Sequence, residues 1–267
     1  MSLTAIIAGR GALPLALRAA LPEPALICAL DGFAPAGVAA DIVFRIERLA
    51  VLLDDLVARG VGRVVFAGAV QRPQLDPALF DPKTAMLVPQ LMAAMQAGDD
   101  ATLRAVIAIF EDWGLAVAGV QDLVPALVPV AAVWCGAVTD RDRADADRAA
   151  AIVAALGAVD VGQGCVVAQG LCLAVEALPG TDAMLASLAG LGPLRPDPGR
   201  GRGLFYKAPK PGQDLRIDLP ALGPDTVRRV AEADLGGIVW QAGGVICLDL
   251  AGMQAQAAAA GLFLWAR

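Results

Sequence analysis

The chain contains no histidine among its 267 residues. This absence excludes Ser-His-Asp and Cys-His nucleophilic systems, and it excludes every metal site that uses imidazole ligands. Acid–base chemistry must therefore come from Asp, Glu, Lys, the single tyrosine (Tyr206) or a metal-bound water.

Charged side chains are also scarce, at 18% of the chain, and the formal net charge is −6. Proteins that bind nucleic acid usually carry a basic surface, so nucleic acid is not an expected partner.

The five cysteines are scattered among apolar residues without the spacing of a zinc site. We expect them to be reduced core residues.

Long apolar runs are missing, although 57% of the residues are hydrophobic and the mean hydropathy is +0.63. The 29 glycines and 18 prolines interrupt the apolar stretches, so no run reaches the length of a membrane span. The N-terminus lacks the basic region of a signal peptide. We therefore expect a cytoplasmic protein, whose apolar surface allows peripheral contact with a membrane.

Strand and helix patterns alternate through the first half of the chain. The strand-like runs lie at 3–8, 24–31, 41–46 and 62–67. Helical spacing in the intervening segments predicts a Rossmann-like, doubly wound parallel sheet.

The second half has a mixed pattern, with a β-hairpin predicted around Gln169-Gly170. The uncharged segment 123–139, broken by prolines, indicates the domain junction. The predicted fold class is thus α/β, with a Rossmann-like N-terminal domain at 1–130 and a mixed, α+β-like catalytic domain at 131–267.

A glycine-containing loop follows the first predicted strand. Gly9 and Gly11 would allow a ligand phosphate to approach a helix N-terminus. The third glycine of a dinucleotide fingerprint is replaced by Pro14, so an ordinary strand–helix turn remains an alternative. Arg72 lies where another strand leaves the sheet, and it is a candidate phosphate contact or a solvated loop residue.

The segment from Lys207 to Pro220 concentrates polar chemistry. Its polar members are three cations, two carboxylates and an amide: Lys207, Lys210, Arg216, Asp214, Asp218 and Gln213. Two prolines make the first part stiff. Alternation of apolar and charged residues predicts a strand at 215–219. On a regular strand Asp214 and Asp218 would lie about 13 Å apart, too far to share one metal ion. A solvated edge strand is the alternative interpretation.

Four segments, at 6–14, 160–185, 207–227 and 235–249, together resemble one family. They read IIAGRGALP, DVGQGCVVAQGLCLAVEALPGTDAML, KAPKPGQDLRIDLPALGPDTV and LGGIVWQAGGVICLD. The family comprises the histidine-independent UDP-2,3-diacylglucosamine pyrophosphatases of lipid A synthesis in Gram-negative bacteria. The resemblance implies two domains and Mg²⁺-dependent hydrolysis of UDP-2,3-diacylglucosamine to UMP and 2,3-diacylglucosamine 1-phosphate (lipid X), with water attacking the α-phosphorus.

The resemblance also implies an essential aspartate in the C-terminal domain, which we assign to Asp214 first and Asp218 second. Candidate metal ligands are Asp214, Asp182 and Asp160. The candidate substrate-binding residues are Gly9, Gly11, Arg72, Gln163, Thr181, Lys207, Lys210, Gln213 and Arg216. The expected partners are the lipid substrate and product, the cytoplasmic face of the inner membrane, and a second copy of the chain in a homodimer.

Two other functions are compatible with the residues alone. One is a nicotinamide-dependent oxidoreductase that uses the N-terminal half, and the missing third glycine argues against it. The other is a non-catalytic carrier of lipid or nucleotide, which would bind the ligand without turnover.

Overall fold

The computed structural model describes residues 3–70, 75–96 and 98–267, which form two compact α/β units. Unit 1 comprises Met1–Pro125 together with Asp214–Asp218. Unit 2 comprises Ala126–Gln213 and Leu219–Arg267. The α/β class is as predicted. The first half of the sequence therefore does not form unit 1 alone, because five residues from late in the chain belong to it.

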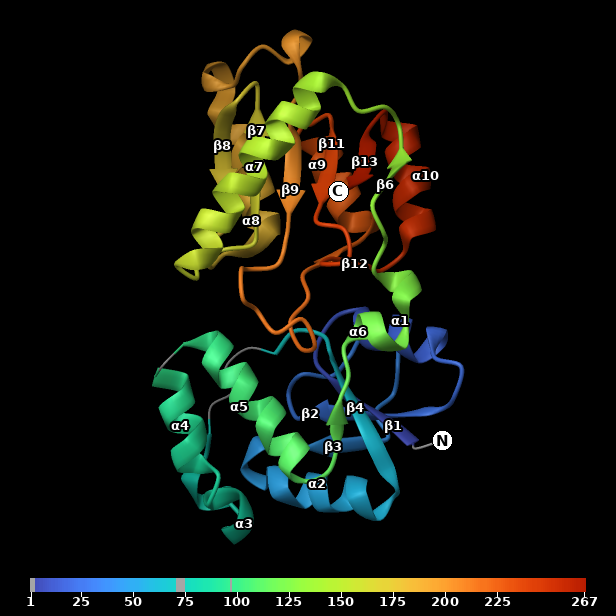
Figure 1. The fold of residues 1–267 in the computed structure, drawn as a ribbon, viewed down its shortest axis with the longest axis vertical. Helices are drawn as coiled ribbons and strands as arrows, with labels where there is room; N and C mark the ends of the chain where they lie inside the picture. Colours follow the sequence, from blue (N-terminus) through green and yellow to red (C-terminus); the bar gives the residue numbers. More distant parts are fainter. Residues whose placement is uncertain (1–2, 71–74, 97) are drawn as a thin grey trace. The chain divides into compact units, whose positions relative to one another are not determined.

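Unit 1 is built on a parallel five-stranded sheet with the order β3-β2-β1-β4-β5 (Figure 1). This is the doubly wound order that the alternating pattern predicts. The strands are β1 (Leu3–Ala8), β2 (Ala25–Leu30), β3 (Ile42–Phe44), β4 (Val61–Ala67) and β5 (Ala116–Val117). The helices are α1 (Leu13–Ala20), α2 (Leu49–Ala58), α3 (Pro82–Ala85), α4 (Val88–Gln96), α5 (Asp99–Asp112) and α6 (Val120–Leu123).

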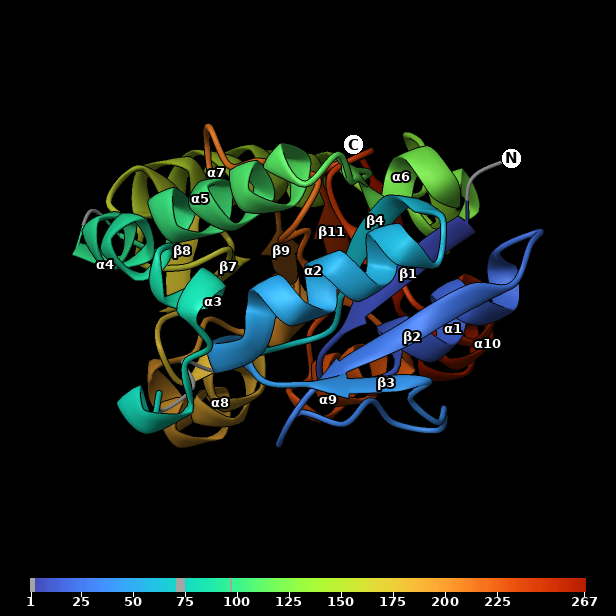
Figure 2. The same ribbon diagram turned by 90° about the horizontal axis from the view of Figure 1, so that it is seen from below.

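The core of unit 1 lies where α2 and α5 pack against the sheet. Apolar residues at helical spacing on α2, such as Leu49, Leu53 and Leu56, meet Val64 of β4 and Phe110 of α5. Figure 2 shows α2 crossing in front of β1 and β4. Both faces of the sheet are covered, which explains why its strands are continuous apolar runs rather than alternating ones.

Unit 2 is built on a six-stranded mixed sheet with the order β6-β13-β11-β9-β7-β8. Its three central strands β9, β11 and β13 are parallel, and the outer strands are antiparallel to their neighbours. The strands of this sheet are β6 (Ala132–Cys135), β7 (Gly164–Ala168), β8 (Leu171–Val175), β9 (Leu204–Lys207), β11 (Gly237–Trp240) and β13 (Phe263–Ala266). A separate parallel pair consists of β10 (Ala221–Leu222) and β12 (Ile246–Cys247).

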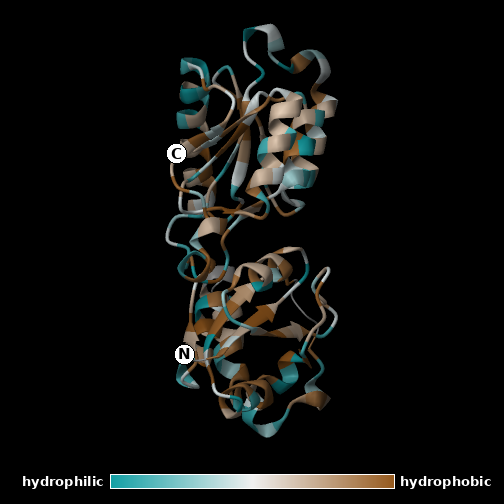
Figure 3. Cartoon of the chain, turned by 90° about the vertical axis from the view of Figure 1, so that its right-hand side faces the viewer, coloured by the Kyte–Doolittle hydropathy of each residue, from teal (hydrophilic) through white to brown (hydrophobic). Residues whose placement is uncertain are grey.

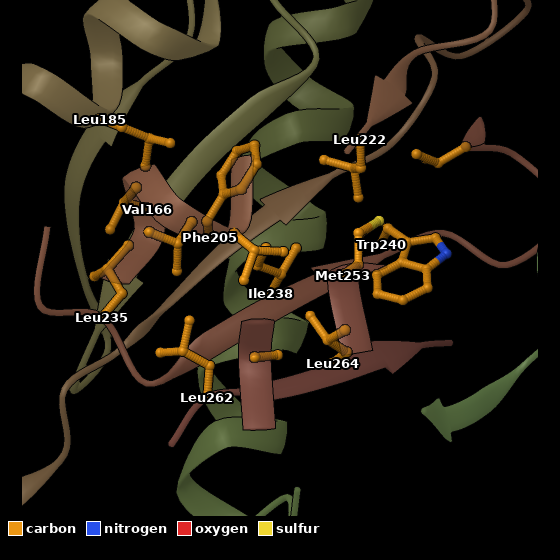
Figure 4. Packing of buried hydrophobic residues seen from close by; sticks show 14 of the residues in the cluster. Val166, Leu185, Phe205, Leu222, Leu235, Ile238, Trp240, Met253, Leu262 and Leu264 are labelled. Atoms are coloured by element: carbon orange, nitrogen blue, oxygen red, sulfur yellow. The ribbon is translucent and has the colours of Figure 1, made fainter. Parts of the chain in front are cut away.

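Helices cover both faces of the unit 2 sheet. One face packs against α7 (Asp140–Ala158). The other packs against α8 (Gly180–Ser187), α9 (Pro224–Glu232) and α10 (Leu250–Ala260). Figure 4 shows the second core, in which Phe205, Ile238 and Trp240 meet helix residues such as Leu185 and Met253. The strands of both units are correspondingly coloured as hydrophobic in Figure 3.

The predicted hairpin is present, and its turn follows from the sequence. Gln169 and Gly170 both have positive φ, at 54° and 80°, as a two-residue hairpin turn requires. The buried carboxylate of Asp145 on α7 accepts both of their N–H groups, at 2.9 and 2.7 Å. No helix in the described part of the chain is long and apolar enough to cross a membrane.

The predicted strand at 215–219 is wrong, because this segment forms a turn. Asp214 accepts the N–H of Arg216 with its side chain at 3.0 Å and the N–H of Ile217 with its carbonyl at 3.3 Å. These local bonds replace a strand ladder. The side chain of Ile217 packs against the core of unit 1, so the alternation reflects one anchored residue rather than a sheet face.

We predict that Ile217→Ala lowers the stability of unit 1 by about 1–2 kcal/mol, because half-buried apolar contacts are lost. Differential scanning calorimetry should show a drop in Tm of roughly 3–6 °C. The matched control is Met86→Ala, an exposed apolar residue of the same unit, which should leave the Tm unchanged. Equal effects of the two changes would contradict the anchoring role of Ile217.

Candidate active site

Lys207 lies at the carboxyl end of β9, the edge where parallel strands present ligand-binding residues. The sheet register places Gly164 beside it on β7 and Trp240 beside it on β11. Paired residues of neighbouring strands share one face of the sheet, so Lys207 lies on the face that carries Phe205 and the apolar core. Lys207 is only 8% exposed, which is rare for a lysine.

Two polar residues surround the Lys207 ammonium. Its Nζ donates to Thr181 Oγ1 at 2.7 Å, and Thr181 in turn donates to Glu176 Oε1 at 2.9 Å. The distance from Lys207 Nζ to Glu176 Oε1 is 3.7 Å. Thr181 is fixed by its place in the first turn of α8, and Glu176 follows directly after β8. The structure therefore joins two sequence-predicted residues, Lys207 and Thr181, to a carboxylate.

A second cluster in unit 2 fixes the loop after β9. Gln213 Oε1 accepts the backbone N–H of Lys210 at 3.0 Å and Gln163 Nε2 at 3.2 Å. Lys210 Nζ forms an ion pair with Asp160. Pro211 packs closely over Gly157, where a Cβ atom would lie 2.6 Å from the proline ring. This part of the loop is held by bonds and packing, in agreement with the stiffness expected from its prolines.

Asp214 begins the five-residue segment that belongs to unit 1. Arg216 donates to both of its carboxylate oxygens, with Nη2 at 2.7 Å from Oδ2 and Nε at 3.0 Å from Oδ1. The remaining end of the guanidinium contacts Glu111 of α5 at 2.8 Å. The hydrogen bonds from Arg216 lower the pKa of Asp214, and the positive charge of Arg104 acts in the same direction. Asp214 is therefore ionised and fixed in orientation at neutral pH.

The candidate metal ligands differ in their surroundings. Asp182 is exposed and pairs with Arg229 at 2.9 Å, whereas Asp160 pairs with Lys210. Both belong to unit 2, and Asp214 belongs to unit 1. Asp218 is exposed at the end of the turn. Among the residues that the structure describes, no group of three or more acidic or cysteine side chains is gathered as a preformed metal cage.

The glycine loop of unit 1 has a packing explanation. A Cβ atom on Gly9 would lie 2.6 Å from the carbonyl oxygen of Ala69, and the neighbouring Arg10 forms a bridge with Ala69. Gly9 is therefore required by the close approach of two backbone segments. Gly11 has φ of 102° and open space around its Cα, so its glycine allows the turn into α1. Arg72 lies outside the described residues.

A cavity of about 810 Å³ lies elsewhere in unit 2, at the amino ends of β9, β11 and β13. Its lining includes Arg141, Arg200 and Arg202 but none of the sequence-predicted site residues. Arg202 donates to the C-terminal carbonyl of α10 at Gly261. The cavity is thus separate from the Lys207 cluster, which lies at the opposite edge of the sheet.

Sequence reasoning missed two carboxylates that contact the candidate residues, Glu176 and Glu111. Glu176 interrupts the apolar run that forms β8, and a charged residue closing such a run was the available signal. Glu111 gave no such signal, since it lies among ordinary polar residues at the end of α5.

Comparison with known proteins connects this chain to characterised sequences. The model of the LpxI N-terminal domain matches residues 3–127, and the model of the LpxI C-terminal domain matches residues 131–265. A Caulobacter vibrioides protein named UDP-2,3-diacylglucosamine pyrophosphatase LpxI is 36% identical over 97% of this chain and 95% of its own length. The chain therefore belongs to the LpxI family.

Proposed function

We propose that this protein hydrolyses the pyrophosphate bond of UDP-2,3-diacylglucosamine in lipid A biosynthesis, yielding UMP and 2,3-diacylglucosamine 1-phosphate. The observation that carries the proposal is the near full-length similarity to a relative named for this activity. Water attacks the α-phosphorus. The bond between the α-phosphorus and the bridging oxygen breaks, and the bridging oxygen leaves as part of the lipid phosphate. The attacking water gives up a proton in the process.

The cations of unit 2 suit a diphosphate substrate. Pyrophosphate cleavage is promoted mainly by positioning and by neutralising charge on the phosphoryl oxygens. In this proposal Lys207 and Lys210 contact those oxygens. Gln163, Thr181 and Gln213 supply hydrogen bonds that keep the lysines in place, as their observed contacts support.

Asp214 has the properties of a metal-binding or water-positioning carboxylate. Its lowered pKa makes it a weak base, so accepting a hydrogen bond from water, or binding a cation, suits it better than removing a proton. Its side chain is 20% exposed, so a ligand can reach it. Arg216, which the sequence assigns to the diphosphate, instead orients Asp214 in the proposed mechanism. Asp218, the second candidate, is exposed at the end of the same turn.

The oxygen donors present fit Mg²⁺, which is commonly held by one or two carboxylates together with substrate phosphates and waters. Asp214 is the first candidate to hold it. Asp160 and Asp182 are weaker candidates because each is paired with a cation. When bound, Mg²⁺ would neutralise charge on the diphosphate. The protein residues orient the substrate and the water.

The acylated substrate also suggests where the protein acts. We propose peripheral contact with the cytoplasmic face of the inner membrane, to which the acyl chains of the substrate would bring the protein. The fully exposed side chain of Leu178 and the largely exposed Leu194 support such contact. A homodimer stays a prediction from the sequence.

The first test is Asp214→Asn. We expect UMP release from UDP-2,3-diacylglucosamine to fall by at least about 100-fold, because the amide cannot replace an ionised carboxylate toward water or metal. Asp112→Asn is the matched control, an exposed aspartate in the same unit, and should retain full activity. UMP release near the wild-type rate in the Asp214 variant would refute the assignment. Tight ligand binding without turnover in the wild-type protein would favour a carrier.

The second test removes divalent cations. We expect EDTA to abolish UMP release and added Mg²⁺ to restore it in a saturable manner, with no change in Tm, because the fold does not contain a metal cage among its described residues. Calorimetric melting measured in parallel separates a catalytic effect from a structural one. Undiminished activity after exhaustive chelation would show that the reaction does not need the cation.

A further inference from the structure

Lys207 places an ammonium group in a buried position of unit 2, which is rare for a lysine. Its side chain is 10% exposed and lies on the face of the sheet that carries the apolar core. Burial disfavours the charged form of a lysine unless a carboxylate or strong acceptors compensate it. A lysine that is to bind an anion must nevertheless stay protonated.

Glu176 is the carboxylate that the described contacts bring to Lys207. It lies 3.7 Å from the ammonium and is also linked to it through the Thr181 hydroxyl. The neighbouring strand positions, Gly164 and Trp240, carry no charge. Asp182 of α8 is turned away to Arg229. Among the contacts described here, Glu176 brings a negative charge to Lys207.

Glu176 is closely packed by the chain around it. Its second oxygen, Oε2, is buried and has no hydrogen-bond partner among the described residues. A Cβ atom on Gly164 would lie 2.6 Å from this oxygen, and one on Gly162 would lie 2.0 Å from the Glu176 carbonyl. Two glycines thus allow the chain to close over the Glu176 carboxylate.

We infer that Glu176 is a positioning residue that keeps Lys207 charged and in place, acting directly and through Thr181, so that Lys207 can bind the diphosphate of the substrate. The last step rests on the proposed function. When the diphosphate arrives, it takes over from Glu176 as a counter-charge of Lys207. Glu176 itself does not need to touch the substrate.

This role predicts a particular pH dependence for Glu176→Gln. The amide removes the negative charge at similar volume, so the buried ammonium of Lys207 gives up its proton at lower pH than in the wild type. Near pH 6, where Lys207 is still protonated, we expect kcat/KM within about threefold of the wild type, because a competitor for the cation has also been removed. Near pH 9 we expect at least a tenfold loss. A purely structural defect would reduce activity by a similar factor at every pH.

Thr181 provides the conservative comparison. Thr181→Ser keeps the hydroxyl bridge, so we expect Lys207 acetylation to follow the same pH dependence as in the wild type. Thr181→Val removes the bridge and should show a weaker form of the same pH-dependent loss. The Tm of each variant, measured at both pH values, shows whether folding is affected.

A second measurement does not need catalysis. The chain has only three lysines, Lys83, Lys207 and Lys210, so acetylation by acetic anhydride can be followed at each by mass spectrometry. Only the neutral amine reacts. In the folded Glu176→Gln protein we expect Lys207 to react at lower pH than in the wild type. Lys83 pairs with Asp54 and Lys210 pairs with Asp160, so neither depends on Glu176 and both serve as internal controls.

An unchanged pH dependence of Lys207 acetylation in the Gln variant, including no reaction in either protein, would overturn the inference. A uniform loss of activity across pH would do the same. If the wild-type protein failed to release UMP but Lys207 acetylation shifted as expected, the proposed function would fail while the link between Glu176 and Lys207 would stand.

Discussion

The bidentate bond between Arg216 and Asp214, extended to Glu111, is the interaction on which the late part of the chain depends. It converts a segment with the alternation of a strand into a turn and, with Ile217, makes that turn part of unit 1. The boundary between the units falls between Gln213 and Asp214. Adjacent residues of one short loop thus belong to different units.

The charged residues Asp214 of unit 1 and Lys207 of unit 2 are stabilised in different ways. Asp214 is held by guanidinium hydrogen bonds that favour its ionised form. Lys207 is held in a largely desolvated position, where Glu176 lies 3.7 Å from its Nζ and Thr181 accepts its hydrogen bond. Neither arrangement uses histidine. In the mechanism that we propose, such fixed charges matter more than a titrating base.

Much of the fold followed from the sequence because both sheets are buried. The apolar run at Leu3–Ala8 became β1 with the expected bounds, and the turn residues of the hairpin were legible at Gln169. The uncharged segment 123–139, expected as the junction, contains the division between the units after Pro125 and also β6. One expected strand was wrong for a physical reason. The alternation of apolar and charged residues at 215–219 predicted a strand. Instead, the side chain of Asp214 accepts the backbone N–H of Arg216, and the segment forms a turn.

Some of the candidate site residues could be proposed from the sequence because they are close together in it. Clustering of charges in one loop pointed to Lys207, Lys210 and Asp214 as candidates. Glu176 is far from that loop in the sequence and meets Lys207 only through the strand register and the start of α8. Gly9, which suggested a phosphate loop, also has a packing explanation, because a Cβ atom there would lie 2.6 Å from the Ala69 carbonyl oxygen.

The incorporation of Asp214–Asp218 into unit 1 means that the polypeptide passes between the units three times rather than once. A proteolytic nick after Pro125 would therefore not release a free N-terminal fragment, because the Arg216 guanidinium and the Ile217 side chain would still hold the two pieces together. For the same reason, an N-terminal fragment expressed by itself would lack the Ile217 side chain that packs against its core. It would also lack the Arg216 guanidinium that pairs with Glu111.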